Sequence, residues 1–208
     1  MSSINIAQWI VMIPVLLFAI TIHEYSHGMV AYSLGDPTAK NAGRLTLNPI
    51  SHLDPLGAIC LFFFHFGWAK PVPVNVMNFR NMRRDIILMS LSGPLANLSA
   101  AFVAGLFLRV FPLDIDLYKL VLLYMIIFNV GLGIFNLLPI PPLDGSHVME
   151  NLLPYRAAER YRQIGRYAPI VLIGIFIMDR FLYTNIIGRV LNYPIALLVN
   201  LFSGIKLF

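Results

Sequence analysis

Long apolar runs, separated by short stretches that hold most of the charged residues, constrain this chain more than any other feature. Three runs, residues 6–34, 85–110 and 117–138, are long enough to cross a bilayer as helices. A helix that rises 1.5 Å per residue needs about 20 residues to cross a hydrocarbon core of roughly 30 Å. Charged residues make up 12% of the chain and hydrophobic residues 58%, whereas soluble domains carry about 25% charged residues. The sequence therefore predicts a multi-pass membrane protein.

Shorter apolar runs leave the number of crossings open. They cover residues 53–68, 167–178 and 181–202. We expect an all-α membrane bundle with about four to six apolar segments. Residues 148–166, which contain four arginines, predict a surface or interfacial helix.

The region between the first two long runs, residues 36–84, has a different texture. It is rich in proline and contains short β-like runs at residues 44–47 and 72–76. We therefore expect a small re-entrant or cytoplasmic-side β element beside the helices. No internal repeat is visible, so a single domain is expected over residues 1–208, with a core at 6–150 and C-terminal helices at 151–208.

An H-E-x-x-H motif lies in the C-terminal half of the first apolar run, at His23, Glu24 and His27. Residues i and i+4 share one face of a helix. Two imidazoles placed in this way can bind one metal ion, and the glutamate between them can act as a general base. Polar side chains in an apolar helix are costly unless they are paired, metal-bound or near water. A polar cluster satisfied by neighbouring helices, or a proton relay, remains an alternative.

A catalytic zinc ion usually takes three protein ligands, so a third ligand is needed. One class of soluble zinc proteases has a further histidine at the position of Ser33, which cannot replace it. The best remote candidate is Asp144, in the proline-rich sequence LPIPPLDG after the third long run. Its alternative role is that of a turn-forming Asp-Gly pair.

Together these residues resemble the site-2 protease family of intramembrane zinc metalloproteases, in its compact bacterial form without a PDZ domain. The matching stretches are HEYSHG (23–28), GRLTLNP (43–49), GWAKPVPVN (67–75), SGPLAN (92–97) and FNLLPIPPLDG (135–145).

The resemblance implies a site and an activity. It implies one Zn²⁺ per chain, bound by His23, His27 and Asp144, with Glu24 as the catalytic base. Asn136 matches an asparagine that helps to hold the substrate or the oxyanion, and Asn97 matches a family position of less certain role. The implied activity is an endopeptidase that cuts transmembrane or membrane-embedded segments near the cytoplasmic side.

The ligands can meet only if the chain crosses the membrane an even number of times between His27 and Asp144. The runs at 85–110 and 117–138 supply two crossings, so residues 53–68 should fold back rather than cross once. The linkers on the side of Asp144 then carry most of the cations: Lys40, Arg44, Lys70, Arg80, Arg83, Arg84, Arg156, Arg160, Arg162 and Arg166. By the positive-inside rule this side is cytoplasmic.

These features also set the expected partners and location. The net charge of +5 reflects cytoplasmic loops, so no nucleic acid is expected. The expected partners are the lipid bilayer and a membrane-spanning peptide or protein substrate, and the expected location is the cell membrane.

Two other functions compete with this one. A membrane protease of the prenyl-protein type would need a downstream glutamate ligand, and only Glu150 and Glu159 follow. A membrane zinc-binding relative without protease activity, such as a transporter or a chaperone-like protein, is the other alternative. Transporters usually repeat their site helices in two halves.

Overall fold

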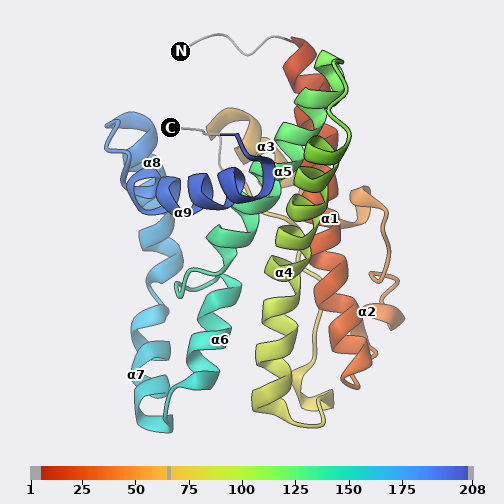
Figure 1. Cartoon of the computed structure of the whole chain (residues 1–208). Coiled ribbons are helices and arrows are strands. Elements are labelled where there is room, and N and C mark those ends of the chain that lie inside the picture. Colours follow the sequence, from red (N-terminus) through yellow and green to blue (C-terminus); the bar gives the residue numbers. More distant parts are fainter. Residues whose placement is uncertain (1–5, 65–66, 206–208) are drawn as a thin grey trace.

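The computed structural model describes residues 6–64 and 67–205, and nearly all regular structure within these ranges is helical (Figure 1). The long helices are α1 (Ile6–Ser33), α4 (Met82–Val110), α5 (Asp116–Asn136) and α9 (Ile186–Ser203). The shorter ones are α2 (Thr38–Asn41), α3 (Pro55–Phe64), α6 (Asp144–Leu152), α7 (Tyr155–Gly165) and α8 (Ala168–Phe181), with 3-10 turns at Pro49–His52 and Val76–Asn78.

Helices α1, α4 and α5 lie side by side and form the centre of the molecule (Figure 1). The buried face of α1 follows a four-residue spacing, through Val11, Val15, Ala19, His23, His27 and Ala31. The two histidines therefore continue an apolar stripe that points into the bundle. On α4 the buried residues are mostly small and include Ser90, Gly93, Ala101 and Ala104. Small residues at such an interface let helix backbones approach closely.

Helix α9 lies across α4 and α5 rather than along them (Figure 1). Val199 joins Ala101, Ala104, Ile126 and Val130 in one buried apolar cluster. A Cβ atom on Gly105 of α4 would lie 2.5 Å from the carbonyl oxygen of Phe202. Glycine thus permits the close crossing of α4 and α9.

Residues 53–64 and 67–69 lie against each other, in agreement with the expected fold-back of this run. Leu53 and Ala69 form an isolated antiparallel bridge. A Cβ atom on Gly57 would collide with the backbone of Trp68, and one on Gly67 would collide with the carbonyl oxygen of Gly57. The two limbs of this hairpin therefore touch through glycine backbones. Residues 65 and 66 lie outside the described ranges.

The predicted β element is not found. Across residues 6–64 and 67–205 the only β pairing is the Leu53–Ala69 bridge. Pro73 removes one backbone donor from the 72–76 run, and Pro71 removes another directly before it. The amides of Val72 and Asn75 donate instead to the side chains of Glu24 and Asp36.

The expected surface helix at 148–166 is divided in two. Helix α6 ends at Leu152 and α7 begins at Tyr155, with Pro154 between them. Proline favours the start of a helix and disfavours its interior, so the break follows from the sequence.

Four helices have the length and apolar composition to cross a membrane: residues 8–33 of α1, together with α4, α5 and α9. This architecture is that of an integral membrane protein, in agreement with the predicted fold class apart from the β element.

Candidate metal centre

The three predicted ligands meet at one point, although Asp144 is 121 residues from His23 in sequence. His23 and His27 are 5% and 7% exposed on the inner face of α1. Asp144 is the first residue of α6, which begins directly after the turn that follows α5. A Cβ atom on Gly145 would collide with the carbonyl oxygens of Leu137 and Leu138. Gly145 therefore lets α6 start against the end of α5, and this places Asp144 beside α1.

The distances between the ligand atoms suit one metal ion. His23 Nε2 lies 3.0 Å from Asp144 Oδ2, and His27 Nε2 lies 3.3 Å from the same oxygen. The two Nε2 atoms are 3.0 Å apart. Tetrahedral ligands about 2.0–2.1 Å from zinc would be separated by about 3.3 Å. The three atoms therefore form a triangle of roughly the required size.

The outer nitrogen of each ring shows where the hydrogens are. His27 Nδ1 lies 2.8 Å from the carbonyl oxygen of Met89. His23 Nδ1 lies 2.6 Å from Oδ1 of Asn97, whose amide nitrogen donates to the carbonyl oxygen of Ala19. A carbonyl oxygen only accepts, so both Nδ1 atoms carry the hydrogen and both Nε2 atoms of the neutral rings present a lone pair.

A bound cation would stabilise the close approach of the three ligand atoms. With both rings neutral in this form, two imidazole lone pairs and an acceptor-only carboxylate face one another. The outer nitrogens have partners on neighbouring helices, so the inner nitrogens are the atoms that remain to bind a metal ion. Two histidines and one aspartate form a ligand set that zinc accepts, with one position left open. The residues therefore fit the ion that the sequence predicts.

Gly93 of α4 faces this centre directly. A Cβ atom at this position would lie 2.5 Å from His27 Nε2 and 2.7 Å from His23 Nε2. Such contacts are far closer than side chains tolerate, so only glycine leaves the space open. In the sequence Gly93 is one of two glycines in the 85–110 run, and the spacing of the run alone does not distinguish its role from ordinary helix packing.

Glu24 lies on the same turn of α1 and is partly buried. Its Oε2 accepts a hydrogen bond of 3.0 Å from the backbone amide of Val72. Pro71 and Pro73 have no N–H group, so this amide is the only backbone donor in the Pro-Val-Pro tripeptide. The Val72 side chain packs against α1, because a Cβ atom on Gly28 would be 3.1 Å from Val72 Cγ1.

Asp36 holds the same extended segment to the end of α1. Its buried carboxylate accepts hydrogen bonds from the amide of Asn75 at 2.8 Å, the side chain of Asn78 at 2.7 Å and the amide of Thr38 at 3.1 Å. Burial raises the pKa of the Asp36 carboxyl, but hydrogen bonds from Thr38, Asn78 and Asn75 outweigh it and hold the pKa below its ordinary value. The ionised carboxylate therefore fixes the segment that reaches Glu24.

Asn136 is the last residue of α5, and its amide nitrogen donates to the carbonyl oxygen of Leu132 at 3.0 Å. Its predicted contact with substrate stays a prediction.

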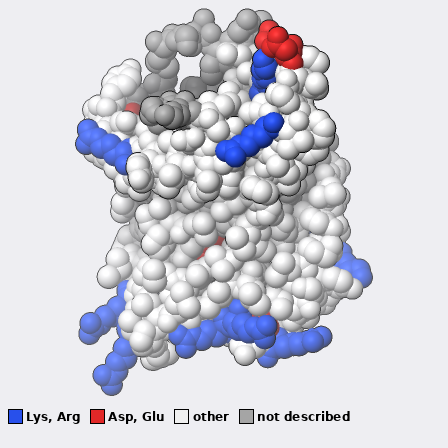
Figure 2. Space-filling model, in the orientation of Figure 1, with Lys and Arg blue, Asp and Glu red and all other residues white. Residues whose placement is uncertain are grey.

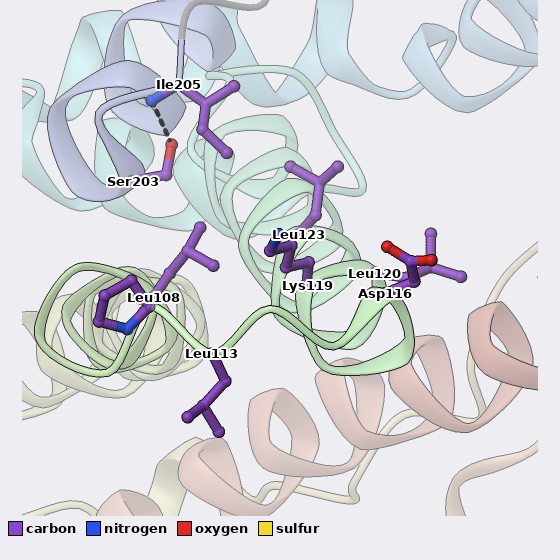
Figure 3. A pocket seen from close by; sticks show the side chains of 9 residues that line it. Leu108, Leu113, Asp116, Lys119, Leu120, Leu123, Ser203 and Ile205 are labelled. Carbon is purple, nitrogen blue, oxygen red and sulfur yellow. Dashed lines mark hydrogen bonds between the residues drawn. The ribbon is translucent and has the colours of Figure 1, made fainter.

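One cavity among the described residues lies away from this centre. It has a volume of about 500 Å³ and is lined mainly by apolar side chains from the ends of α4, α5 and α9, with Asp116 and Lys119 beside it (Figure 3). None of the predicted site residues lines it.

Membrane-crossing helices that surround an H-E-x-x-H motif, with a remote carboxylate at its histidines, define a membrane-embedded metallopeptidase fold. The chain belongs to peptidase family M50, the site-2 protease family. The profile of that family matches residues 113–177. A relative from Bacillus subtilis (strain 168), YwhC, is named as a zinc metalloprotease. It is 39% identical over 202 residues, covering 91% of this chain and 90% of its own.

More distant relatives share the name of zinc metalloprotease. Rip2 of Mycolicibacterium smegmatis is 29% identical over 189 residues, covering 88% of this chain and 71% of its own. Rip2 of Mycobacterium tuberculosis (strain H37Rv) is 30% identical over 183 residues, covering 83% of this chain and 66% of its own. No solved structure matches the chain significantly.

Proposed function

We propose that this protein is an intramembrane zinc endopeptidase that cuts membrane-spanning or membrane-embedded segments. The observation that carries the proposal is the meeting of His23, His27 and Asp144 inside a helix bundle, with Glu24 alongside. The names of the relatives support a zinc-dependent protease.

In this proposal His23, His27 and Asp144 hold one zinc ion. When bound, the ion would lower the pKa of a water molecule and polarise the scissile carbonyl group. Glu24 accepts a proton from the attacking water and passes it to the leaving amine. The Val72 amide donates to Oε2 of Glu24 and so orients the carboxylate for this proton transfer.

The proposed depth of the site follows from α1. His27 lies six residues before the end of the helix at Ser33, which corresponds to about 9 Å. Lysines and arginines gather at that end of the molecule, and a broad band without lysine or arginine lies above them in the view of Figure 2. By the positive-inside rule, we infer that the site lies within the cell membrane near its cytoplasmic face.

The substrate must change shape before it is cut. A transmembrane helix hides its peptide bonds in i to i−4 hydrogen bonds, so a membrane-spanning substrate has to unwind locally at the site. Asn136, at the end of α5 and before the Asp144 turn, is the residue that we propose to contact the unwound backbone.

The test combines metal content with cleavage in purified protein. Wild type is expected to bind one zinc ion and to cut a membrane-spanning peptide. His23→Ala and Asp144→Ala are expected to lose both properties, whereas Glu24→Gln should keep the zinc and lose the cleavage.

Full zinc retention by Asp144→Ala would remove the proposed third ligand. Cleavage by Glu24→Gln at the wild-type rate would remove the proposed base. Zinc binding by wild type without cleavage of any membrane peptide would favour the zinc-binding relative without protease activity.

A further inference from the structure

Two asparagines lie completely buried next to the metal centre, Asn97 on α4 and Asn129 on α5, each 0% exposed. A buried amide without hydrogen bonds is costly. Apolar residues surround Asn129 on its own helix, where Ile126 and Val130 are also fully buried. A leucine at position 129 would suit such a core, so the polar pair calls for a reason beyond packing.

The two amides form a chain of hydrogen bonds that starts at a backbone carbonyl and ends at a metal ligand. Asn129 Nδ2 donates to the carbonyl oxygen of Met125 at 2.8 Å. Asn97 Nδ2 donates to Oδ1 of Asn129 at 2.8 Å and to the carbonyl oxygen of Ala19 at 2.9 Å. Asn97 Oδ1 faces His23 Nδ1 at 2.6 Å.

Each link fixes the direction of the next. The Met125 carbonyl accepts only, so it binds the amino group of Asn129 and turns Oδ1 of Asn129 towards Asn97. That oxygen accepts from the amino group of Asn97 together with the carbonyl oxygen of Ala19, and the two acceptors turn Oδ1 of Asn97 towards His23. An amide in the opposite orientation would donate to Nδ1 of His23 and leave the ring hydrogen on Nε2, where it would block a metal ion.

We propose that Asn129 is a positioning residue for the metal centre, which acts through Asn97 to keep the hydrogen of His23 on Nδ1 and the lone pair on Nε2. This inference rests on the proposed metal site. Groups that bind the outer nitrogen of a metal-ligating histidine typically change metal affinity 10–100-fold when they are removed. Asn129 is one step further from the ring, and its only path to it is through Asn97.

The test is zinc affinity, measured by competition with a chelator on the purified full chain. Asn97→Leu is expected to weaken zinc binding by about 10–100-fold, and Asn129→Leu by about 10-fold. Because Asn129 acts through Asn97, the double variant should bind zinc no more weakly than Asn97→Leu alone. Ser99→Leu is the matched control, because it places the same side chain at an exposed position of α4 and should leave the affinity unchanged.

A conservative variant separates positioning from packing. Asn129→Asp in its neutral form, which burial favours, can still donate to Met125 and accept from Asn97, so it should restore most of the affinity that Asn129→Leu loses. Histidine ¹⁵N NMR of the zinc-loaded protein adds a direct readout. The Nδ1–H signal of His23 should exchange faster in Asn129→Leu, whereas the signal of His27, held by Met89, should not change.

The outcomes that overturn the inference are distinct from those that overturn the proposed function. Wild-type zinc affinity in Asn129→Leu, or losses that add fully in the double variant, would show that Asn129 does not act on His23. If leucine prevents folding, Asn129→Ala gives the same comparison. Absence of zinc binding by the wild type would instead remove the metal site itself.

Discussion

At Gly93 the missing side chain keeps space open between two histidine nitrogens. Gly93→Ala would place a methyl group 2.5 Å from His27 Nε2, so we expect zinc affinity to fall at least about 10-fold. The matched control is Gly131→Ala on α5, where a Cβ atom would meet nothing within 4 Å. Zinc affinity and thermal unfolding of both variants provide the measurement. Equal zinc binding by the two variants would contradict the assignment.

Asp36 makes a pH-dependent contribution to stability. Its pKa is lower in the folded protein than in the unfolded chain, so the stabilisation is complete above the unfolded value of about 3.9 and is lost as the pH falls through the folded value. Asp36→Asn should reduce the free energy of unfolding by about 2 kcal/mol at pH 7, because hydrogen bonds to a charged group are lost. The difference between the variant and wild type should shrink below about pH 4. A difference that stays constant with pH would contradict this account.

At the scale of single residues, the sequence predicts those site residues whose spacing along the chain indicates metal binding. The spacing of His23 and His27 along a helix is enough to place them on one face. The need for a third ligand makes Asp144 the best remote candidate, and the family resemblance agrees with it. Asn129 and the amide of Val72 could not be predicted, because nothing local distinguishes them. Their roles depend on which helix or segment lies opposite, and that is set by the packing of the whole bundle.

At the scale of elements, α7 braces the loop that carries Asp144. Tyr161 donates to the carbonyl oxygen of Pro139 at 2.9 Å, and a Cβ atom on Gly165 would lie 2.9 Å from Cγ of Pro141. Arg162 also pairs with Glu150 of α6 at 2.8 Å. The loop is therefore held between α5 and α7.

Tyr161→Phe should loosen this loop and weaken zinc binding by a few-fold, since one neutral hydrogen bond contributes about 1 kcal/mol. Tyr155→Phe on the same helix is the control, because Tyr155 is 82% exposed. Zinc affinity by chelator competition distinguishes the two. If both variants bind zinc like wild type, α7 does not brace the site.

The long helices follow from hydrophobic run length, whereas the extended segment does not follow from β propensity. Residues 72–76 contain three valines, which predict a strand. The alternating prolines and the side-chain carboxylates of Glu24 and Asp36 take up its hydrogen-bonding groups instead. Such competition between backbone and side-chain partners cannot be read from a local pattern.

On the scale of the whole molecule, unpaired positive charge gathers at the end near the metal centre. The acidic side chains at the end near the metal centre are each hydrogen-bonded or ion-paired: Asp36, Asp54, Asp85, Glu150 and Glu159. Arg156, Arg160 and Arg166 take part in no ion pair in the described part of the chain. The free charge at this end is therefore positive, which suits the cytoplasmic side.

The start of α1 and the end of α9 lie towards the opposite end of the molecule (Figure 1), and Arg109 near the end of α4 binds the carbonyl oxygen of Leu201 at 2.6 Å. Alkaline phosphatase fused after the C-terminus should therefore be active, and green fluorescent protein at the same place should be dark. A reporter inserted between α6 and α7 should give the reverse pattern. Cytoplasmic fluorescence from the C-terminal fusion would show that α9 crosses the membrane.

The Val72 amide that binds Glu24 also bears on how the sequence can vary. Every amino acid except proline supplies the same N–H group, so the genetic code can change this codon widely without touching the donor. A substitution at position 72 therefore changes how the side chain packs against Gly28. Only a change to proline would remove the hydrogen bond to the Glu24 carboxylate. The hydrogen bond to Glu24 should therefore survive most point mutations at position 72.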